Sequence, residues 1–225
     1  MNQRVLFWEG CSNVRDLGGL RTCDGRVTRG GSLVRSDTPA RLTGAGWSAL
    51  YAYGIRTILT LRTHGMTEAE LDITPPYPDL AVVQVAIEDV TDMEFVRQWA
   101  STELWSTPLY YQDALQRWPE RHAAAISAIA QARPGGVLFH CVRGHDRTGI
   151  MALLLLALAG VTPEDMLADY ALSLDPERDA LLARHHSSVR QVILSVLDGL
   201  DVEGYLRMGG VNQADLIAVR QRLLG

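Results

Sequence analysis

The sequence predicts an α/β fold in which a central, mostly parallel sheet is flanked by helices and followed by a helical C-terminal half. Up to about residue 140, short apolar segments alternate with segments whose apolar residues recur at helical spacing. This alternation is typical of parallel sheets with helical crossovers. Beyond residue 148 the helical spacing continues almost without interruption. No linker or repeat divides the 225 residues, so we expect residues 1–225 to form a single domain.

Four segments are the expected strands of a sheet of about four or five. Residues 32–35 form a short strand-like piece, and residues 55–61 (IRTILTL) are rich in β-branched side chains. Residues 80–87 (LAVVQVAI) are apolar enough that we expect burial on both faces of the sheet. Residues 137–139 (VLF) follow a Pro-Gly-Gly break as a short, wholly apolar strand.

Capping residues and apolar spacing place the helices. Thr43 is an expected N-cap, and Gly54 stands where a helix through Tyr53 would end. Thr162, followed by a proline and two acids, marks another helix start. The remaining expected helices cover residues 93–101, 109–118, 119–133 and 176–197, with a last one running from the cap Asn212 to residue 224.

Composition narrows the class of protein. The net charge of −5 is spread without long runs of one sign, which argues against nucleic-acid binding. Three cysteines without a Cys-x-x-Cys pair fit a reducing compartment. The first ten residues lack a signal-peptide pattern, and the most apolar run, residues 150–159, is too short to span a bilayer. We therefore expect a cytoplasmic protein without stable membrane insertion, in which that run is a buried helix.

The segment that indicates chemistry is residues 140–149 (HCVRGHDRTG), between the last strand and the buried helix. A loop that leads from a strand into a helix N-terminus is where open α/β proteins bind ligands, and free N–H groups favour an anion there. Cys141 is the candidate nucleophile, because nearby positive charge favours the thiolate. Arg147, six positions on, can fold back and hold two phosphate oxygens with its planar guanidinium.

The other loop residues are expected to have supporting roles. Gly144 allows the backbone to turn its N–H groups inward. Thr148 offers a hydroxyl to the thiolate or to hydrolysis of a thiophosphate intermediate. His140 is expected to hold the loop by hydrogen bonds rather than to touch the substrate. The predicted phosphate-binding residues are Val142, Arg143, Gly144, His145 and Thr148.

This loop resembles that of the protein tyrosine phosphatase superfamily, in which Cys, five residues and Arg-Thr-Gly follow an apolar strand. The fuller His-Cys-x-x-Gly-x-Asp-Arg-Thr-Gly pattern is similar to the atypical bacterial members related to phosphoinositide phosphatases. Residues 13–19 (NVRDLGG), 54–62 (GIRTI followed by LR) and 169–172 (DYAL) also resemble that group, in the expected order. The resemblance covers nearly the whole chain and implies a phosphatase-type α/β domain with no metal or organic cofactor.

Two loop residues depart from the pattern of that group. His145 stands where the group usually has Lys, and Arg143 where it usually has Ala. The resemblance implies that the loop Lys helps to bind acidic phosphate substrates, and all 21 basic residues here are arginines. An unshifted histidine becomes charged only near pH ~6.5, so we expect an acid-side dependence of phosphate affinity, with Arg143 restoring charge if it points inward. We hypothesise that substrate preference has shifted from the family norm.

A phosphatase also needs a proton donor for the leaving oxygen. The resemblance points to Asp146, the aspartate directly before the loop arginine. Asp89 and Asp92 follow the strand at 80–87, where a substrate-facing loop is expected, and are the reserve candidates. Residues 118–120 (WPE) are similar to the Trp-Pro-Asp context of many relatives, but we interpret them as a helix start.

Other residues have structural interpretations. A metal site made of His140, Cys141, His145 and Asp146 would pack four ligands into seven residues, which rarely gives a tetrahedral site. Residues 15–19 (RDLGG) are interpreted as a turn and a buried ion pair that brace the loop. Arg62 either reaches the site or has a structural role. The histidines at 64, 185 and 186 are expected on the surface. Cys11 and Cys23 carry no functional signal.

We therefore expect a cysteine-dependent phosphatase that cleaves phosphate monoesters through a cysteinyl phosphate. Its substrate would be a phosphorylated protein, a phosphoinositide or a small phosphorylated metabolite. A catalytically weak phosphate-binding module is one alternative, although such a module need not retain Cys141. A rhodanese-type sulfurtransferase is another, although it does not need the Arg-Thr-Gly helix entry. The sequence predicts neither the oligomeric state nor the physiological substrate.

Overall fold

The computed structural model describes residues 4–225 and contains a five-stranded sheet in the order β1-β2-β5-β3-β4. The strands are β1 (Arg15–Asp16), β2 (Leu33–Ser36), β3 (Ile55–His64), β4 (Ala81–Asp89) and β5 (Gly136–His140). The edge strand β1 pairs antiparallel with β2, and the other three pairings are parallel. The predicted α/β class and mostly parallel sheet are therefore confirmed.

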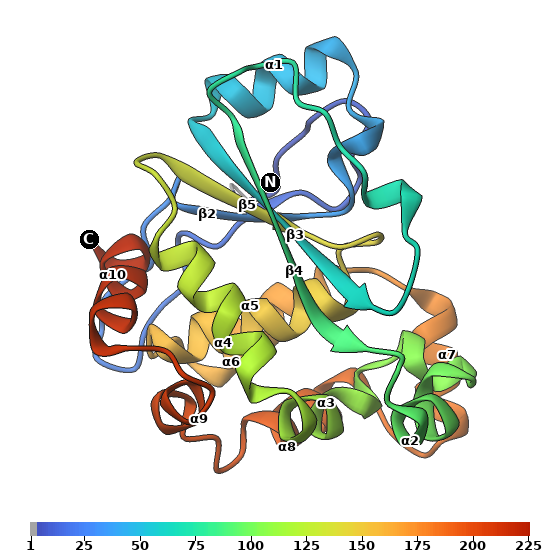
Figure 1. The fold of residues 1–225 in the computed structure, drawn as a ribbon. Coiled ribbons are helices and arrows are strands. Elements are labelled where there is room, and N and C mark those ends of the chain that lie inside the picture. Colours follow the sequence, from blue (N-terminus) through green and yellow to red (C-terminus); the bar gives the residue numbers. More distant parts are fainter. Residues whose placement is uncertain (1–3) are drawn as a thin grey trace.

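Hydrophobic cores cover both faces of this sheet. Along β5, Val137 and Phe139 face the larger core, whereas Leu138 faces the smaller one, because side chains alternate across a strand. The smaller core packs beneath α1 (Gly44–Ala52), and the larger one packs against α4 (Pro119–Ala130) and α5 (Asp146–Leu158), which lie together on the other face (Figure 1). Helix α5 is buried almost all round, as its apolar run predicts.

One strand differs from its prediction. The segment at 80–87 is predicted to be buried on both faces, but β4 is the second edge strand of the sheet, and most of its side chains are only half-buried. Gln84 is exposed. Its apolar composition reflects the one face that packs on the core, since Ile87 belongs to the larger cluster and Val83 and Val85 pack against it.

The helical C-terminal half is confirmed, but one expected helix is broken. Residues 176–197 form two helices, because His186 adopts a left-handed backbone (φ 54°) and Ser188 then caps a new helix by accepting from the N–H of Gln191. The remaining helices are α2 (Met93–Phe95), α3 (Tyr111–Arg117), α6 (Pro163–Ala171), α7 (Pro176–Arg184), α8 (Val189–Leu197), α9 (Val202–Met208) and α10 (Gln213–Leu224).

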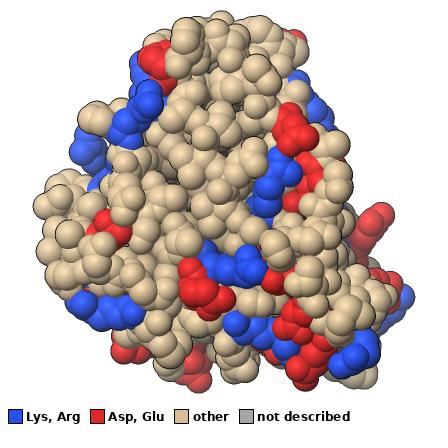
Figure 2. Space-filling view, in the orientation of Figure 1, with Lys and Arg blue, Asp and Glu red and all other residues tan. Residues whose placement is uncertain are grey.

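The parallel strands end at a common edge of the sheet. In Figure 1 the arrows of β3 and β4 point towards the corner where α2 and α7 lie. The segment between β4 and α3 crosses this corner as α2, a π-helical turn (Val96–Ala100) and two short 3₁₀ turns (Glu103–Ser106 and Pro108–Tyr110). Within residues 4–225 no helix is both long and apolar enough to cross a bilayer. Acidic and basic side chains are interspersed over the face shown in Figure 2.

Candidate active site

A pocket of about 410 Å³ lies at this edge, over the loop between β5 and α5. Cys141, which is 3% exposed, lines it together with Arg147 from the first turn of α5. The loop residues Val142, Arg143 and Asp146 also line the pocket. The predicted nucleophile, guanidinium and carboxylate are thus brought to one cavity at a helix N-terminus.

The loop owes its shape to contacts between its backbone and the N-terminal segment of the chain. Gly144 has φ +70°, and a Cβ atom on it would lie 2.4 Å from the carbonyl oxygen of Ser36, so only glycine fits. Arg35 donates from Nη2 to the Gly144 carbonyl at 3.0 Å. Asn13 donates from Nδ2 to the carbonyls of Arg143 (3.1 Å) and Gly144 (3.2 Å). These contacts fix the turn that presents Cys141.

Behind the loop, the buried carboxylate of Asp169 holds three arginines. Its oxygens accept from Arg15 (3.3 Å), Arg35 (2.9 Å) and Arg4. Burial acts to raise the pKa of Asp169, but the three guanidinium groups outweigh it and lower the pKa. The segment 13–19 therefore supports the loop from behind. Arg15 belongs to this cluster, and Asp16 accepts hydrogen bonds from the N–H groups of residues 18 and 31 at 2.6 Å each.

Asp169→Asn should destabilise the fold strongly, because it leaves buried arginines without a counter-charge. Breaking a buried ion pair on one side costs about 3–5 kcal/mol, which urea unfolding would show as a lower midpoint. Asp24→Asn is the matched control, since the Asp24–Arg26 pair is more than half exposed on both sides and should leave the midpoint nearly unchanged. Equal midpoints for the two variants would contradict this account.

His140 and Thr148 flank the loop and are fully buried. The Nδ1 atom of His140 lies 3.1 Å from the Cys141 carbonyl, and its Nε2 lies 2.9 Å from the Thr60 hydroxyl. Burial lowers the pKa of His140 to about 4, so a neutral ring donates to the carbonyl and accepts from the hydroxyl. Thr148 Oγ1 is buried without a hydrogen-bond partner among residues 4–225, and its side chain is not part of the pocket lining.

Two glutamates hold Arg147, and the sequence analysis identified neither. Glu68 Oε1 lies 2.7 Å from Arg147 Nη1, and Glu88 Oε2 lies 3.9 Å from its Nε. The carbonyl of Leu61 also accepts from Nη1 at 2.9 Å. Burial acts to lower the pKa of Arg147, but Cys141 and the two glutamates outweigh it and raise the pKa. The guanidinium therefore stays charged and is positioned by the ends of β3 and β4.

Asp146 has the environment of a proton donor. Its Oδ1 atom is buried without a hydrogen-bond partner in the part of the chain that the structure describes. Burial raises the pKa of Asp146 to about 6, although Arg143 opposes the shift. A carboxyl group that faces the Cys141 pocket and keeps its proton into the mildly acidic range can protonate a leaving oxygen.

The two residues that depart from the family pattern share one partner, Asp175. Arg143 Nη2 lies 2.9 Å and His145 Nδ1 lies 3.3 Å from Asp175 Oδ2. Burial, and then Arg143, lower the pKa of His145 to about 4. The ring is therefore neutral over most of the range in which it was expected to charge, and the expected acid-side dependence moves down towards pH 4. Neither His145 nor Gly144 lines the pocket.

The reserve proton donors lie elsewhere. Asp89 accepts from Arg121 and, at 2.6 Å, from the Thr91 hydroxyl, and Asp92 caps α2 and binds Arg117. Neither lines the Cys141 pocket. Residues 118–120 begin α4, as predicted, with Pro119 at its first position.

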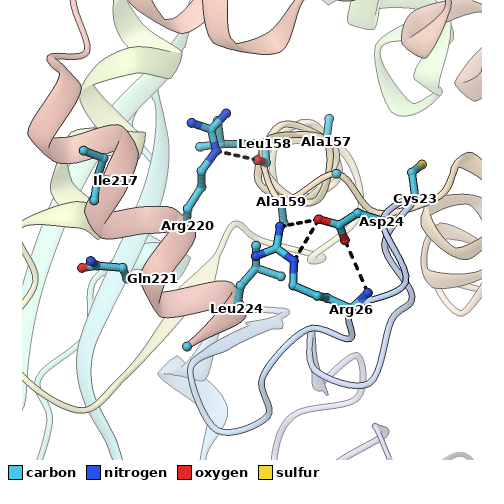
Figure 3. Close-up of a pocket in the computed structure, with 12 residues that line it drawn as sticks. Cys23, Asp24, Arg26, Ala157, Leu158, Ala159, Ile217, Arg220, Gln221 and Leu224 are labelled. Atoms are coloured by element: carbon cyan, nitrogen blue, oxygen red, sulfur yellow. Dashed lines mark hydrogen bonds and ion pairs between the residues drawn. The ribbon is translucent and has the colours of Figure 1, made fainter.

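The remaining cysteines lie apart from the pocket. Cys11 Sγ is 3.5 Å from the Thr38 carbonyl, and burial raises the pKa of this thiol to about 12. Cys23 is exposed and lines a separate cavity of about 470 Å³ beside α10 (Figure 3). There Arg26 binds Asp24, and Arg220 donates to the Leu158 carbonyl, so these charges are already used within the protein. Within residues 4–225 no cluster of three or more His, Cys, Asp or Glu is arranged to hold a metal.

Comparison with known proteins identifies related sequences. Residues 6–225 match the model of the tyrosine phosphatase family. A Cupriavidus necator protein, provisionally named a tyrosine-protein phosphatase, is 33% identical over 168 residues, which cover 73% of this chain and 61% of that relative. The triple specificity protein phosphatase PtpB of Mycobacterium tuberculosis is 27% identical over 278 aligned positions, covering 96% of this chain and 98% of PtpB.

Among solved structures, the catalytic core of Siw14 aligns with 92% of this chain and 94% of its own, at 17% identity and a TM-score of 0.47. That similarity is too low to support an argument about the site. The family match, in contrast, spans almost the whole sequence and includes the Cys141 loop. This chain therefore belongs to the tyrosine phosphatase family.

Proposed function

We propose that this protein hydrolyses phosphate monoesters, phosphotyrosine first among them, through a cysteinyl-phosphate intermediate. The observation that carries the proposal is the meeting of Cys141, Arg147 and Asp146 in one pocket at the N-terminus of α5. Nucleophile, anion clamp and proton donor are the three groups that this chemistry needs. The chain covers 61% of one named relative, so substrate and partners belong to the proposal.

In the first step the substrate phosphate binds to the loop N–H groups and to the guanidinium of Arg147, which Glu68 holds in place. The Cys141 thiolate attacks phosphorus, so a sulfur–phosphorus bond forms while the phosphorus–oxygen ester bond breaks. Asp146 gives its proton to the leaving oxygen and becomes a carboxylate. Loop dipoles and Arg147 stabilise the charge on the equatorial oxygens.

In the second step water replaces the leaving group. The Asp146 carboxylate takes a proton from the water as its oxygen attacks phosphorus. The sulfur–phosphorus bond then breaks, which returns the Cys141 thiolate and releases inorganic phosphate. These steps use groups of the chain and water, and the proposal includes no metal or organic cofactor. We further propose that the protein acts in the cytoplasm as one domain.

Metal-free hydrolysis of p-nitrophenyl phosphate tests the proposal. The wild-type protein should release p-nitrophenol at an unchanged rate when EDTA is added, and orthovanadate should inhibit competitively because it occupies the phosphate loop. Activity that EDTA abolishes and a divalent metal restores would contradict the thiol mechanism. Vanadate binding without turnover of any aryl phosphate would favour the phosphate-binding module instead.

A further inference from the structure

The walls of the phosphate pocket are acidic. Four glutamates line it: Glu68 and Glu70 from the loop between β3 and β4, Glu88 from the end of β4, and Glu103 from the 3₁₀ turn across the pocket. The arginines in the same lining are Arg143 and Arg147. For a site that binds a phosphate dianion, this is an unusual excess of carboxylates.

Most of these charges are already paired inside the protein. Glu68 and Glu88 hold Arg147, and Arg143 binds Asp175. Glu70 forms no ion pair with any of residues 4–225, and its side chain is exposed. Glu103 has a partner in Arg184 at 3.4 Å, but both side chains are about two-thirds exposed. Such a pair contributes little, so an incoming cation can replace Arg184.

The pocket also continues into a second cavity. A neighbouring space of about 410 Å³ shares Glu103, Ser106 and Arg143 with the phosphate pocket and extends along α7. Glu177 lines this extension and forms no ion pair within the described residues. A substrate that fills both spaces must be longer than a single phosphorylated metabolite and must pass Glu103.

We propose that the pocket selects a phosphotyrosyl peptide that carries a lysine or arginine next to the phosphotyrosine, with Glu70 and Glu103 as the recognition residues. The inference rests on the proposed phosphatase function. Trp105 and Met66 line the same pocket and supply apolar surface for the tyrosine ring. Polyanions such as inositol polyphosphates would meet the like charges of Glu70 and of the weakly paired Glu103 at this mouth, and neutral His145 does not offset them.

The test compares two synthetic phosphotyrosine peptides that differ in one feature, arginine or glutamate on both sides of the phosphotyrosine. The wild-type kcat/KM should favour the arginine peptide about tenfold at low ionic strength, and the preference should shrink as salt is added. In the double variant Glu70→Gln/Glu103→Gln the ratio should fall to about twofold or less. A dioctanoyl phosphatidylinositol phosphate should be hydrolysed more slowly than either peptide.

A matched control removes two acids elsewhere. Glu120→Gln/Glu164→Gln changes the net charge equally at two exposed positions outside both cavities, and the tenfold ratio should persist. Wild-type turnover of p-nitrophenyl phosphate with equal kcat/KM for both peptides would overturn the inference alone. Faster turnover of the phosphoinositide would also overturn it. Failure to hydrolyse p-nitrophenyl phosphate would overturn the proposed function and the inference together.

Discussion

Cys141→Ser should reduce the hydrolysis of p-nitrophenyl phosphate by at least roughly 10⁴-fold, which is the scale on which loss of a nucleophile acts. The hydroxyl of serine is a much weaker nucleophile than a cysteine sulfur and cannot form the sulfur–phosphorus bond. The fold should persist, because serine is nearly the same size and the loop is held from outside by Arg35 and Asn13. Initial rates with EDTA present, together with circular dichroism, provide the measurement.

The chain contains its own controls for this experiment. Cys23→Ser changes an exposed thiol beside α10, outside the Cys141 pocket, and should keep wild-type activity. Cys11→Ser changes a thiol whose raised pKa keeps it protonated, and should also retain turnover. If Cys141→Ser kept more than a few per cent of the activity, a water molecule rather than a cysteine would be the nucleophile.

Asp146→Asn should have an effect that depends on the leaving group. General acid catalysis contributes about 10²–10⁴-fold, and the contribution is largest when the departing oxygen is strongly basic. We therefore expect a loss of roughly 10³-fold with phenyl phosphate and only about tenfold with p-nitrophenyl phosphate, whose phenolate leaves unaided. The kcat values of both substrates, measured for both proteins, give the comparison.

The pH dependence of the wild type follows from the same carboxyl group. Burial raises the pKa of Asp146 to about 6, and a general acid acts only while it holds its proton. With phenyl phosphate, kcat should fall as pH rises through about 6, and Asp146→Asn should lose this fall. Asp89→Asn, at the reserve position, should show neither the leaving-group dependence nor the flattened profile. The opposite result would move the proton donor to Asp89.

Local pattern was sufficient to predict most of the fold. The apolar segments at 55–61 and 137–139 became β3 and β5, and the caps at Thr43, Thr162 and Asn212 begin α1, α6 and α10. These signals are local, since a cap or a strand needs only its own few residues. The break at His186 was missed because neither glycine nor asparagine marks the left-handed residue (φ 54°) that follows α7.

The sequence by itself determined the loop that carries Cys141, Asp146 and Arg147, because strand, glycine turn and helix start are contiguous in the chain. Only the tertiary structure decided what surrounds that loop. A β-bulge between Arg62 and Thr63 leaves Ile87 unpaired and places Thr63 opposite Glu88. Regular alternation would have put Ile87 and Glu88 on opposite faces of the sheet. Instead, Ile87 lies in the larger core, and Glu88 accepts a hydrogen bond from the hydroxyl of Tyr110, which belongs to the same core.

The position of Glu68 also depends on the tertiary structure. It lies in an irregular loop where no periodicity indicates which side chain turns inward, and it reaches Arg147 only because α5 packs beside the end of β3. The pairing of Arg143 and His145 with Asp175 likewise joins residues about thirty positions apart. A contiguous motif specifies Cys141 and Arg147. The charged residues that pair with this loop come from distant segments, and these segments come together only when the whole sheet packs.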